Sequence, residues 1–422
     1  MRCSVALLKD VEKRIVEREE ISFRNAVFKS ANQAYWKVLV SDEDKKIRKD
    51  KLEFIRIRKI RLPPRSTVAP LSILRHAFGT AIDVLSSELK KVEETREISH
   101  AVFYPVEDGE IKKDDIIGVM KVYPVNVGDV DDMDYIKSPE IKPKLEETDA
   151  SMVYRDGKNV ARNRIRVKEA WYSRWNLGEW RMLIAEENVR LIPGNSRLIK
   201  VRNIEIPSNS IPAPLYGYRP PFGTVLDIYS PGRPRKIEER KIITHALFIP
   251  FEEGEIKEGD IIGVINVYSV AVGGIVESVA PFLTGSEKGN VIVREDRKLK
   301  RVEFEHRPFF FRRSALGYFK PIISTETKRI RANIPEKVMV EKIDIPAGAI
   351  IQPMSGKVHA AGAVIDVEFE DQRFVEDDRV IDYAIVISPV DGEILRGDMI
   401  GVIMQYQISP LTYPELFVKR YG

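Results

Sequence analysis

The alternation of apolar and polar residues along the chain predicts a protein built mainly of β-strands. The run from Ile116 to Val125 is rich in β-branched residues, which is typical of a mostly buried strand, and residues 55–62 alternate isoleucine with arginine. Two stretches, residues 5–20 and 85–97, have apolar residues closer to helical spacing. We therefore expect a mainly β protein with a few short helices.

Glycine and aspartate interrupt these strands at defined places. Asp108-Gly109 suits a tight hairpin turn, since both residues tolerate a positive φ. Asp114 occupies a second turn, where later copies of the same segment have Gly259 and Gly397, so we expect a left-handed backbone there. Gly118, inside the strand that follows, predicts a bulge or a close approach of another backbone.

The same pattern is written three times along the chain. The segment EDGEIKKDDIIGV at 107–119 returns as EEGEIKEGDIIGV at 252–264 and as VDGEILRGDMIGV at 390–402. A block around Gly79 returns around Gly223 and Gly362 at the same interval of about 140 residues, too long for one turn of a solenoid. We predict three tandem homologous domains, each a β-barrel or a β-sandwich.

Composition shifts between the copies give the expected boundaries. After residues 128 and 273 the chain becomes polar and contains proline or small residues, as connecting segments do. The predicted organisation is unit 1 at 1–128, a linker at 129–158, unit 2 at 159–273, a linker at 274–290, and unit 3 with a C-terminal tail at 291–422.

The repeated signature resembles an archaeal family known as domain of unknown function twenty-two, which occurs in one to three copies per chain. That resemblance implies an archaeal source and no particular activity. The glycine-containing turns are also similar to the barrel-sandwich hybrid of lipoyl and biotinyl domains. The turns at Gly109, Gly254 and Gly392 lack the modifiable lysine of those domains, so we expect no covalently carried cofactor.

Composition narrows the class of protein. With 43% hydrophobic and 31% charged residues the chain is expected to be globular, and a net charge of +4 makes it no polycation. Cys3 is the only cysteine, which excludes an intramolecular disulfide and a cysteine-clustered metal site. No apolar stretch is long enough for a membrane span or a leader, so we expect a cytoplasmic protein without a membrane partner.

Few residues capable of chemistry recur in all three copies. His100 and His245 share a position that is Tyr383 in the third copy, and common nucleotide and hydrolase motifs are absent. The acids Asp115, Asp260 and Asp398 recur, and we expect them to face solvent at turns. The aspartates that recur between two strands are candidate ligand-binding residues, or else bond to their own turns: Asp83, Asp227 and Asp366.

Positive charge is concentrated in the first unit. Residues 1–65 hold 18 lysines and arginines against 10 acids, whereas the rest of the chain is slightly acidic. Arginines on one face of a strand could grip phosphates or an acidic partner. The candidate residues for an anionic partner are Lys45, Lys46, Arg56, Arg58 and Arg61.

These observations favour a non-catalytic scaffold or adaptor that binds a protein partner, with three units arranged as a fused trimer would be around a pseudo-threefold axis. We assign no catalytic residue, no metal and no cofactor. One alternative is a ligand-binding or metal-binding module, or an enzyme, whose site at the junction of units gathers the recurring aspartates with His100 and His245. Another is nucleic-acid binding through the basic first unit, which we do not favour.

Overall fold

The computed structural model describes most of the chain, and every regular element in that part is a β-strand. The described residues are 2–10, 15–22, 26–30, 33–71, 76–85, 90–128, 147–156, 159–168, 171–215, 219–230, 235, 238–272, 287–295, 298–306, 309–353, 359–370 and 375–411.

The two predicted helices are wrong for the described residues of both stretches, and residues 11–14 and 86–89 lie outside the described part of the chain. Residues 5–10 and 15–20 belong to the antiparallel pair of β1 (Arg2–Asp10) and β2 (Ile15–Ser22). The second stretch contains the end of β8 (Gly79–Leu85) and the start of β9 (Arg96–Pro105), and its residues 90–95 form turns. Strand pairing with tertiary neighbours therefore overrode a weak helical periodicity.

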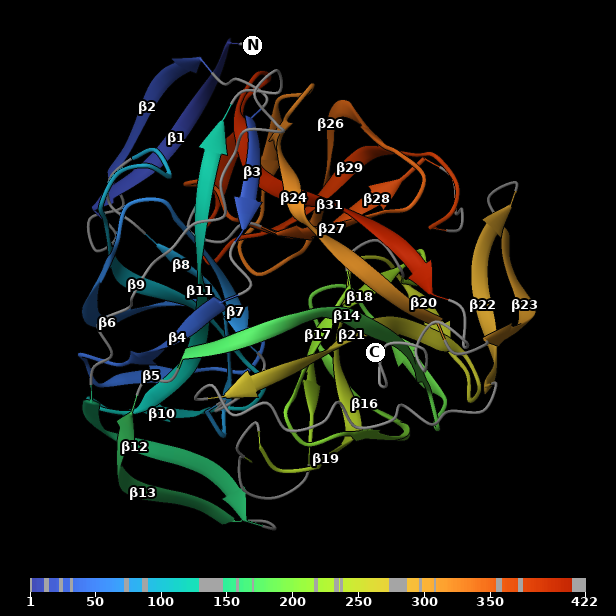
Figure 1. The fold of residues 1–422 in the computed structure, drawn as a ribbon, viewed down its shortest axis with the longest axis horizontal. Helices are drawn as coiled ribbons and strands as arrows, with labels where there is room; N and C mark the ends of the chain where they lie inside the picture. Colours follow the sequence, from blue (N-terminus) through green and yellow to red (C-terminus); the bar gives the residue numbers. More distant parts are fainter. Residues whose placement is uncertain are drawn as a thin grey trace, which may run out of the picture.

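Three units of strands follow one another with the same order, and Figure 1 shows them as three lobes. Unit 1 adds to β1, β2, β8 and β9 the strands β3 (Ala26–Ser30), β4 (Gln33–Val40), β5 (Lys45–Ile47), β6 (Glu53–Leu62), β7 (Ser66–Leu71), β10 (Gly109–Ile111) and β11 (Ile116–Gly128). Unit 2 consists of β12 (Glu147–Asp156), β13 (Asn159–Lys168), β14 (Trp171–Ile184), β15 (Val189–Leu191), β16 (Arg197–Ile206), β17 (Ser210–Pro214), β18 (Gly223–Tyr229), β19 (Lys241–Pro250), β20 (Gly254–Ile256) and β21 (Ile261–Val272). Unit 3 consists of β22 (Glu287–Glu295), β23 (Lys298–His306), β24 (Phe309–Ile323), β25 (Lys328–Ile330), β26 (Glu336–Ile345), β27 (Ala349–Pro353), β28 (Ala363–Phe369), β29 (Arg379–Ile387), β30 (Gly392–Ile394) and β31 (Met399–Leu411).

Each unit buries its own apolar core between small antiparallel sheets. In unit 1 the three-stranded sheet β6-β9-β8 packs on strands β4, β7 and β11, with Phe103 fully buried between them. Phe248 and Val386 occupy the matching places in units 2 and 3. The apolar positions that alternate along β6, such as Ile55 and Ile57, point into this core, which explains why the strand carries arginine on its other face.

The turn and bulge predictions have mixed outcomes. Asp114, Gly259 and Gly397 have φ values of 73°, 88° and 88°, which confirms the left-handed position, and the strand register shifts next to Gly118. Gly109 has no positive φ and forms no hairpin turn, because it begins a strand that pairs with β5. A Cβ added there would lie 2.5 Å from the ring of Phe78, so the position needs glycine for space.

Strand pairing between units closes the three lobes into a ring. Trp171 of β14 pairs with Tyr35 of β4, which joins unit 2 to unit 1. The middle of β14 pairs with the start of β24, which joins unit 2 to unit 3. The middle of β24 pairs with β3, which returns to unit 1. Each long strand thus continues the sheet of the next unit around the ring, as the ribbon in Figure 1 shows.

A shared core lies where the three units meet. It contains equivalent side chains from each unit, among them Val102, Leu247 and Ile385, all nearly inaccessible to solvent. The three initial hairpins, β1–β2, β12–β13 and β22–β23, lie instead at the periphery (Figure 1). Burial of apolar surface around the axis therefore stabilises the ring in addition to the strand pairing.

Candidate functional site

The recurring aspartates of the β8, β18 and β28 strands share a local structural role. The carboxylates of Asp83, Asp227 and Asp366 each accept a hydrogen bond from the backbone N–H of the next residue, at 2.7–2.8 Å. The strand register shifts at each of these positions, so the carboxylate satisfies a donor that the bulge frees from the ladder. This bonding fits the alternative in which they hold their own turns.

Asp366 has a second role between units 2 and 3. It is 1% exposed, and its Oδ2 accepts hydrogen bonds from the hydroxyl of Thr224 at 2.6 Å and lies 3.0 Å from Nε of Arg219. Both partners belong to unit 2. The buried charge is therefore neutralised across the junction, as a buried carboxylate requires.

His100 and His245 occupy matching half-buried positions on β9 and β19. Their Nδ1 atoms lie 3.0 Å from Oγ of Ser99 and 2.8 Å from Oγ1 of Thr244, respectively. Burial lowers the pKa of His245 below its usual value. His100 lines a pocket, described below, whose lining includes none of the recurring aspartates.

The turn acids contradict the sequence prediction that they face solvent. Asp115, Asp260 and Asp398 are fully buried. Oδ2 of Asp115 lies 3.3 Å from Nε2 of His76 and 2.8 Å from the guanidinium of Arg162, which the hairpin of unit 2 supplies. Burial raises the pKa of Asp115, but hydrogen bonds from His76 and Arg162 outweigh that effect and leave the pKa below its usual range.

We call this arrangement a clasp: a buried turn aspartate that contacts a histidine of its own unit and an arginine from the hairpin of a neighbouring unit. Unit 3 has a second clasp, to which the hairpin of unit 1 supplies the arginine. Oδ2 of Asp398 lies 3.0 Å from Nε2 of His359 and 2.6 Å from the guanidinium of Arg18. The backbone N–H of Ala361 donates to Nδ1 of His359, so the ring proton must sit on Nε2 and face the carboxylate. The hairpin of unit 3 reaches the matching turn of unit 2 through the backbone, where the N–H of Asn290 donates to the carbonyl of Gly259.

These contacts assign Asp115 and Asp398 to ring closure. The residue that sequence reasoning missed was the arginine, since Arg18 and Arg162 occupy matching places in two hairpins and Arg301 stands at the third. The three hairpin sequences have little else in common. The arginines could have been found from the sequence by comparing the charge at each matching position of the three copies.

The basic candidates of unit 1 divide between two surfaces. Arg56 and Arg61 are exposed on the outer face of β6, whereas Arg58 is half-buried and pairs with Asp114 at 2.5 Å. Lys45 and Lys46 lie on β5 and line the pocket. Nζ of Lys45 lies 3.1 Å from Glu53 and donates to the carbonyl of Phe54 at 2.8 Å.

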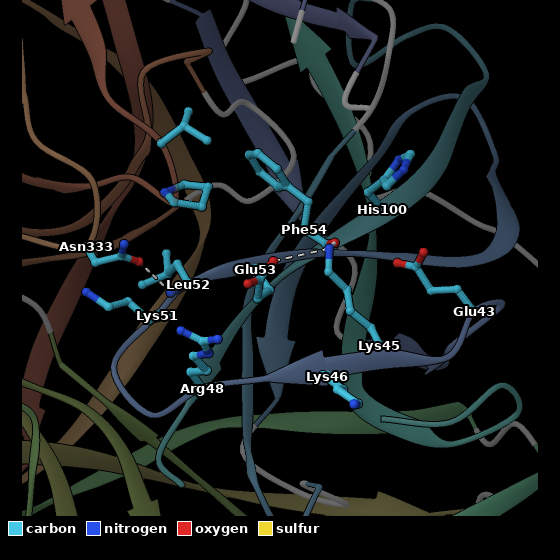
Figure 2. A pocket seen from close by; sticks show the side chains of 12 residues that line it. Glu43, Lys45, Lys46, Arg48, Lys51, Leu52, Glu53, Phe54, His100 and Asn333 are labelled. Atoms are coloured by element: carbon cyan, nitrogen blue, oxygen red, sulfur yellow. Dashed lines mark hydrogen bonds and ion pairs between the residues drawn. The ribbon is translucent and has the colours of Figure 1, made fainter. Parts of the chain in front are cut away.

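The pocket lies where the β5–β6 segment of unit 1 faces unit 3, and we call it the junction pocket. Its volume is about 640 Å³. Figure 2 shows Arg48, Lys51 and Asn333 at one end and Glu43 and His100 at the other. The lining residues are Glu43, Lys45, Lys46, Arg48, Lys51, Leu52, Glu53, Phe54 and His100 of unit 1, with Asn333, Pro389 and Val390 of unit 3.

A hydrogen bond between units lies at one end of this pocket. Asn333 has a φ of 63°, and its Oδ1 accepts the N–H of Leu52 at 2.6 Å. At the junction of units 1 and 2, Asp50 has the same conformation and accepts the N–H of Ser196 at 3.0 Å. At the junction of units 2 and 3 the matching residues are Gly194 and Pro335, which lack the acceptor and the donor together.

The matching space at the junction of units 2 and 3 is filled. Lys337 stands where unit 1 has Phe54, and its Nζ lies 2.8 Å from Glu252 and 5.4 Å from the ring centre of Phe251. Phe251 and Glu252 stand where unit 3 has Pro389 and Val390. The smaller and uncharged pair at the junction of units 3 and 1 leaves the space open.

Metal and membrane sites are not evident in the described ranges. No group of three or more His, Cys, Asp or Glu side chains among those residues is arranged to hold a metal ion. The same part of the chain has no helix long and apolar enough to cross a membrane.

Comparison with known proteins agrees with the threefold structure. The family model described as "Domain of unknown function DUF22" matches residues 3–109, 149–254 and 288–392. The chain belongs to the DUF22 family. Each match runs from an initial hairpin to the strand at β10, β20 or β30, so this member of the DUF22 family carries three copies of the domain in one ring.

One relative matches the chain over about the length of one unit. The chain is 30% identical over 112 residues to "Uncharacterized protein MJ0614" of Methanocaldococcus jannaschii, a match that covers 26% of this chain and 83% of that protein. No solved structure matches the chain.

Proposed function

We propose that this DUF22 protein is a non-catalytic scaffold or adaptor that binds an acidic protein partner through the outer face of β6. We call that surface the β6 face and define it by Arg56, Lys59 and Arg61, which are all exposed. The three units form the rigid frame, and the first unit supplies the recognition surface.

The use of reactive side chains within the ring supports a non-catalytic role. The buried histidines His76 and His359 have both ring nitrogens bonded, one to a backbone N–H and one to an aspartate. A general base needs a nitrogen that can reach a substrate. Each of these histidines instead contacts the aspartate that binds an arginine of a neighbouring unit.

The observation that carries the proposal is the charge difference between equivalent faces. Where the β6 face has three cations, β16 has Lys200, Asn203 and Glu205. The matching positions of β26 are Met339, Lys342 and Asp344. These residues point away from the core, so the packing of the strand does not determine their charge. The concentration of cations on unit 1 alone therefore supports a partner that binds unit 1 and not the other units.

Carboxylates among the cations favour a protein over a nucleic acid. Lys59 pairs with Glu97 at 2.8 Å, and Arg58 pairs with Asp114 beside the same face. Such exposed ion pairs contribute little to stability, so these side chains can break them and form ion pairs with charged groups of a partner protein instead. A phosphate backbone would meet repulsion from these acids, whereas a protein can match alternating charges.

The test is co-purification of partners from extract of the native host with matched charge variants. The variant R56E/R61E changes the β6 face, and K200E/K342E makes the same net charge change on the faces of units 2 and 3. We expect a stoichiometric partner to be retained by the wild type and by K200E/K342E and lost by R56E/R61E.

Two outcomes would contradict the proposal. One is a protein that runs alone, or a partner that both variants retain equally. The other is tight binding to a labelled 20-nucleotide RNA or DNA whose affinity falls steeply with salt and is lost in R56E/R61E, which would favour the nucleic-acid alternative.

A further inference from the structure

We propose that the junction pocket binds a small organic phosphate monoester, with the phosphate between Arg48, Lys51 and Asn333 and a compact apolar body against Phe54 and Val390. This site goes beyond the proposed function, because it takes a small molecule and uses side chains outside the β6 face. Three features of the pocket carry the inference.

The first feature is a cluster of donors at one end of the pocket that the pocket's own carboxylates do not engage. Arg48 and Lys51 are exposed, and within the described part of the chain neither the guanidinium of Arg48 nor the ammonium of Lys51 has an ion pair or a hydrogen bond. Oδ1 of Asn333 is occupied by the N–H of Leu52, and because a backbone N–H can only donate, the Nδ2 group of Asn333 remains as a donor. A guanidinium, an ammonium and an amide are the groups that bind oxyanions.

The second feature is the charge balance of the pocket. Lys45 and Glu53 form an ion pair and cancel. Glu43, whose Oε1 accepts a hydrogen bond from the backbone N–H of Arg56 at 2.8 Å, contributes one negative charge to the pocket. Lys46, Arg48 and Lys51 contribute three positive charges. The excess of two positive charges matches a phosphate monoester, which is close to a dianion at neutral pH.

The third feature is the apolar wall and the size of the space. Phe54, Pro389 and Val390 line the pocket beside the cations. A volume of about 640 Å³ lies within the range of about 300–1,000 Å³ typical of small-molecule sites. A bare phosphate ion would leave this wall uncovered, so the site favours an ester with an apolar or aromatic body.

The other two junctions lack the same donors. At the junction of units 1 and 2 the residues that match Arg48, Lys51 and Asn333 are Ile192, Asn195 and Asp50. At the junction of units 2 and 3 the match to Arg48 is Arg331, whose Nε pairs with Glu336 at 2.7 Å. The matching residues of the other two junctions, such as Arg331, therefore serve as controls for variants of the junction pocket.

The test is calorimetric titration of the full-length protein at low salt with phenyl phosphate as the probe. Inorganic phosphate, benzoate and phthalate serve as comparison ligands. We expect phenyl phosphate to bind with one site per chain and at least tenfold more tightly than each of the other three. R48Q should weaken that binding at least tenfold, whereas R331Q, the matched control in unit 3, should leave it unchanged.

A second variant separates the site from folding. N333D keeps the acceptor for the N–H of Leu52, and Asp50 performs that role in unit 1 with nearly the same φ of 60°. It replaces the Nδ2 donor with a carboxylate oxygen facing the phosphate. We expect N333D to retain the wild-type melting temperature and to lose at least tenfold in affinity for phenyl phosphate.

The proposal is overturned by the absence of phenyl phosphate binding to the wild type, by equal losses in R48Q and R331Q, or by wild-type affinity in N333D. Equal binding of inorganic phosphate would overturn the ester assignment, and equal binding of benzoate or phthalate would overturn the phosphate assignment. R56E/R61E should still bind phenyl phosphate, so a failure of this site and a failure of the β6 face can be told apart.

Discussion

The junction of units 3 and 1 and the junction of units 2 and 3 have the same backbone geometry and opposite contents. In the first, Asn333 bonds to Leu52 and a pocket lies beside the contact. In the second, Lys337 and Glu252 fill the matching space with an ion pair. Ring closure by strand pairing and apolar burial sets the distance between units, and the side chains at each junction are then free to differ.

The polar contacts differ in matched pairs. Asp50 with Ser196 and Asn333 with Leu52 each join an acceptor to a backbone donor. At the third junction, Gly194 has no side-chain acceptor and Pro335 has no backbone N–H to donate. A buried donor without an acceptor costs more than the loss of the whole pair, so the two halves of a junction contact are expected to change together.

The largest expected effect comes from the clasp between units 1 and 2. D115A leaves His76 and the N–H of Lys112 without their buried acceptor and removes the ionic partner of Arg162. We expect a loss of about 3 kcal/mol in the free energy of unfolding, measured by chemical denaturation.

The neighbouring exposed acid provides the control for that variant. Asp114 pairs with Arg58 and Arg164 at the surface. D114N keeps a residue suited to its φ of 73° and should cost less than about 1 kcal/mol. Equal losses of unfolding free energy in D115A and D114N would show that the buried contacts of the clasp add nothing to stability beyond those of an exposed ion pair.

The next effect concerns the turn contact at the same junction. Oδ1 of Asp50 accepts from the hydroxyl and backbone N–H of Ser196 and from the hydroxyl of Tyr104. D50A removes this acceptor and should destabilise the ring by about 2 kcal/mol in thermal unfolding. D50N, which has the residue of unit 3, should recover at least half of the loss, and a D50N as unstable as D50A would contradict this account.

The third prediction is the pH dependence of the His76 clasp, which unit 2 lacks. Burial lowers the pKa of His76 below the value of about 6.5 expected in the unfolded chain. The unfolded state then binds a proton more readily, so stability falls as pH drops below about 6.5, by at most about 1.4 kcal/mol per pH unit. The low pKa of Asp115 keeps that carboxylate charged until stronger acid.

Thermal melts between pH 7 and 5 measure this effect. H76Q should melt with a shallower pH dependence than the wild type. H245Q removes a half-buried histidine outside the clasp, whose pKa burial also lowers, and should flatten the curve less. Identical slopes for the wild type and H76Q would contradict the assignment.

The smallest effect rebuilds the missing contact at the junction of units 2 and 3. Gly194 has a φ of 77°, which asparagine tolerates, and a Cβ there would lie 3.5 Å from the nearest atom. P335A restores a donor. A double-mutant cycle of G194N and P335A should show a favourable coupling of about 1 kcal/mol in unfolding free energy, and additive effects would show that the two positions do not meet.

Internal comparison of the sequence was sufficient to predict three β-rich units and the left-handed position at Asp114. It failed for residues 5–20, where pairing between β1 and β2 outweighed an apolar spacing compatible with a helix. It also failed for Asp115 and Asp398, because the arginines and histidines that hold them come from distant segments, and a turn aspartate is exposed unless a neighbouring unit covers it.

The sequence by itself determined the number of units, their strands and the places where the backbone requires glycine or aspartate, because these depend on local sterics and on the period of apolar residues. Only the tertiary structure decided which acids are buried, which cations remain unpaired and where a pocket opens. Those properties depend on which unit lies against which, and residues such as Arg48 and Asn333 meet only because the third unit returns to the first.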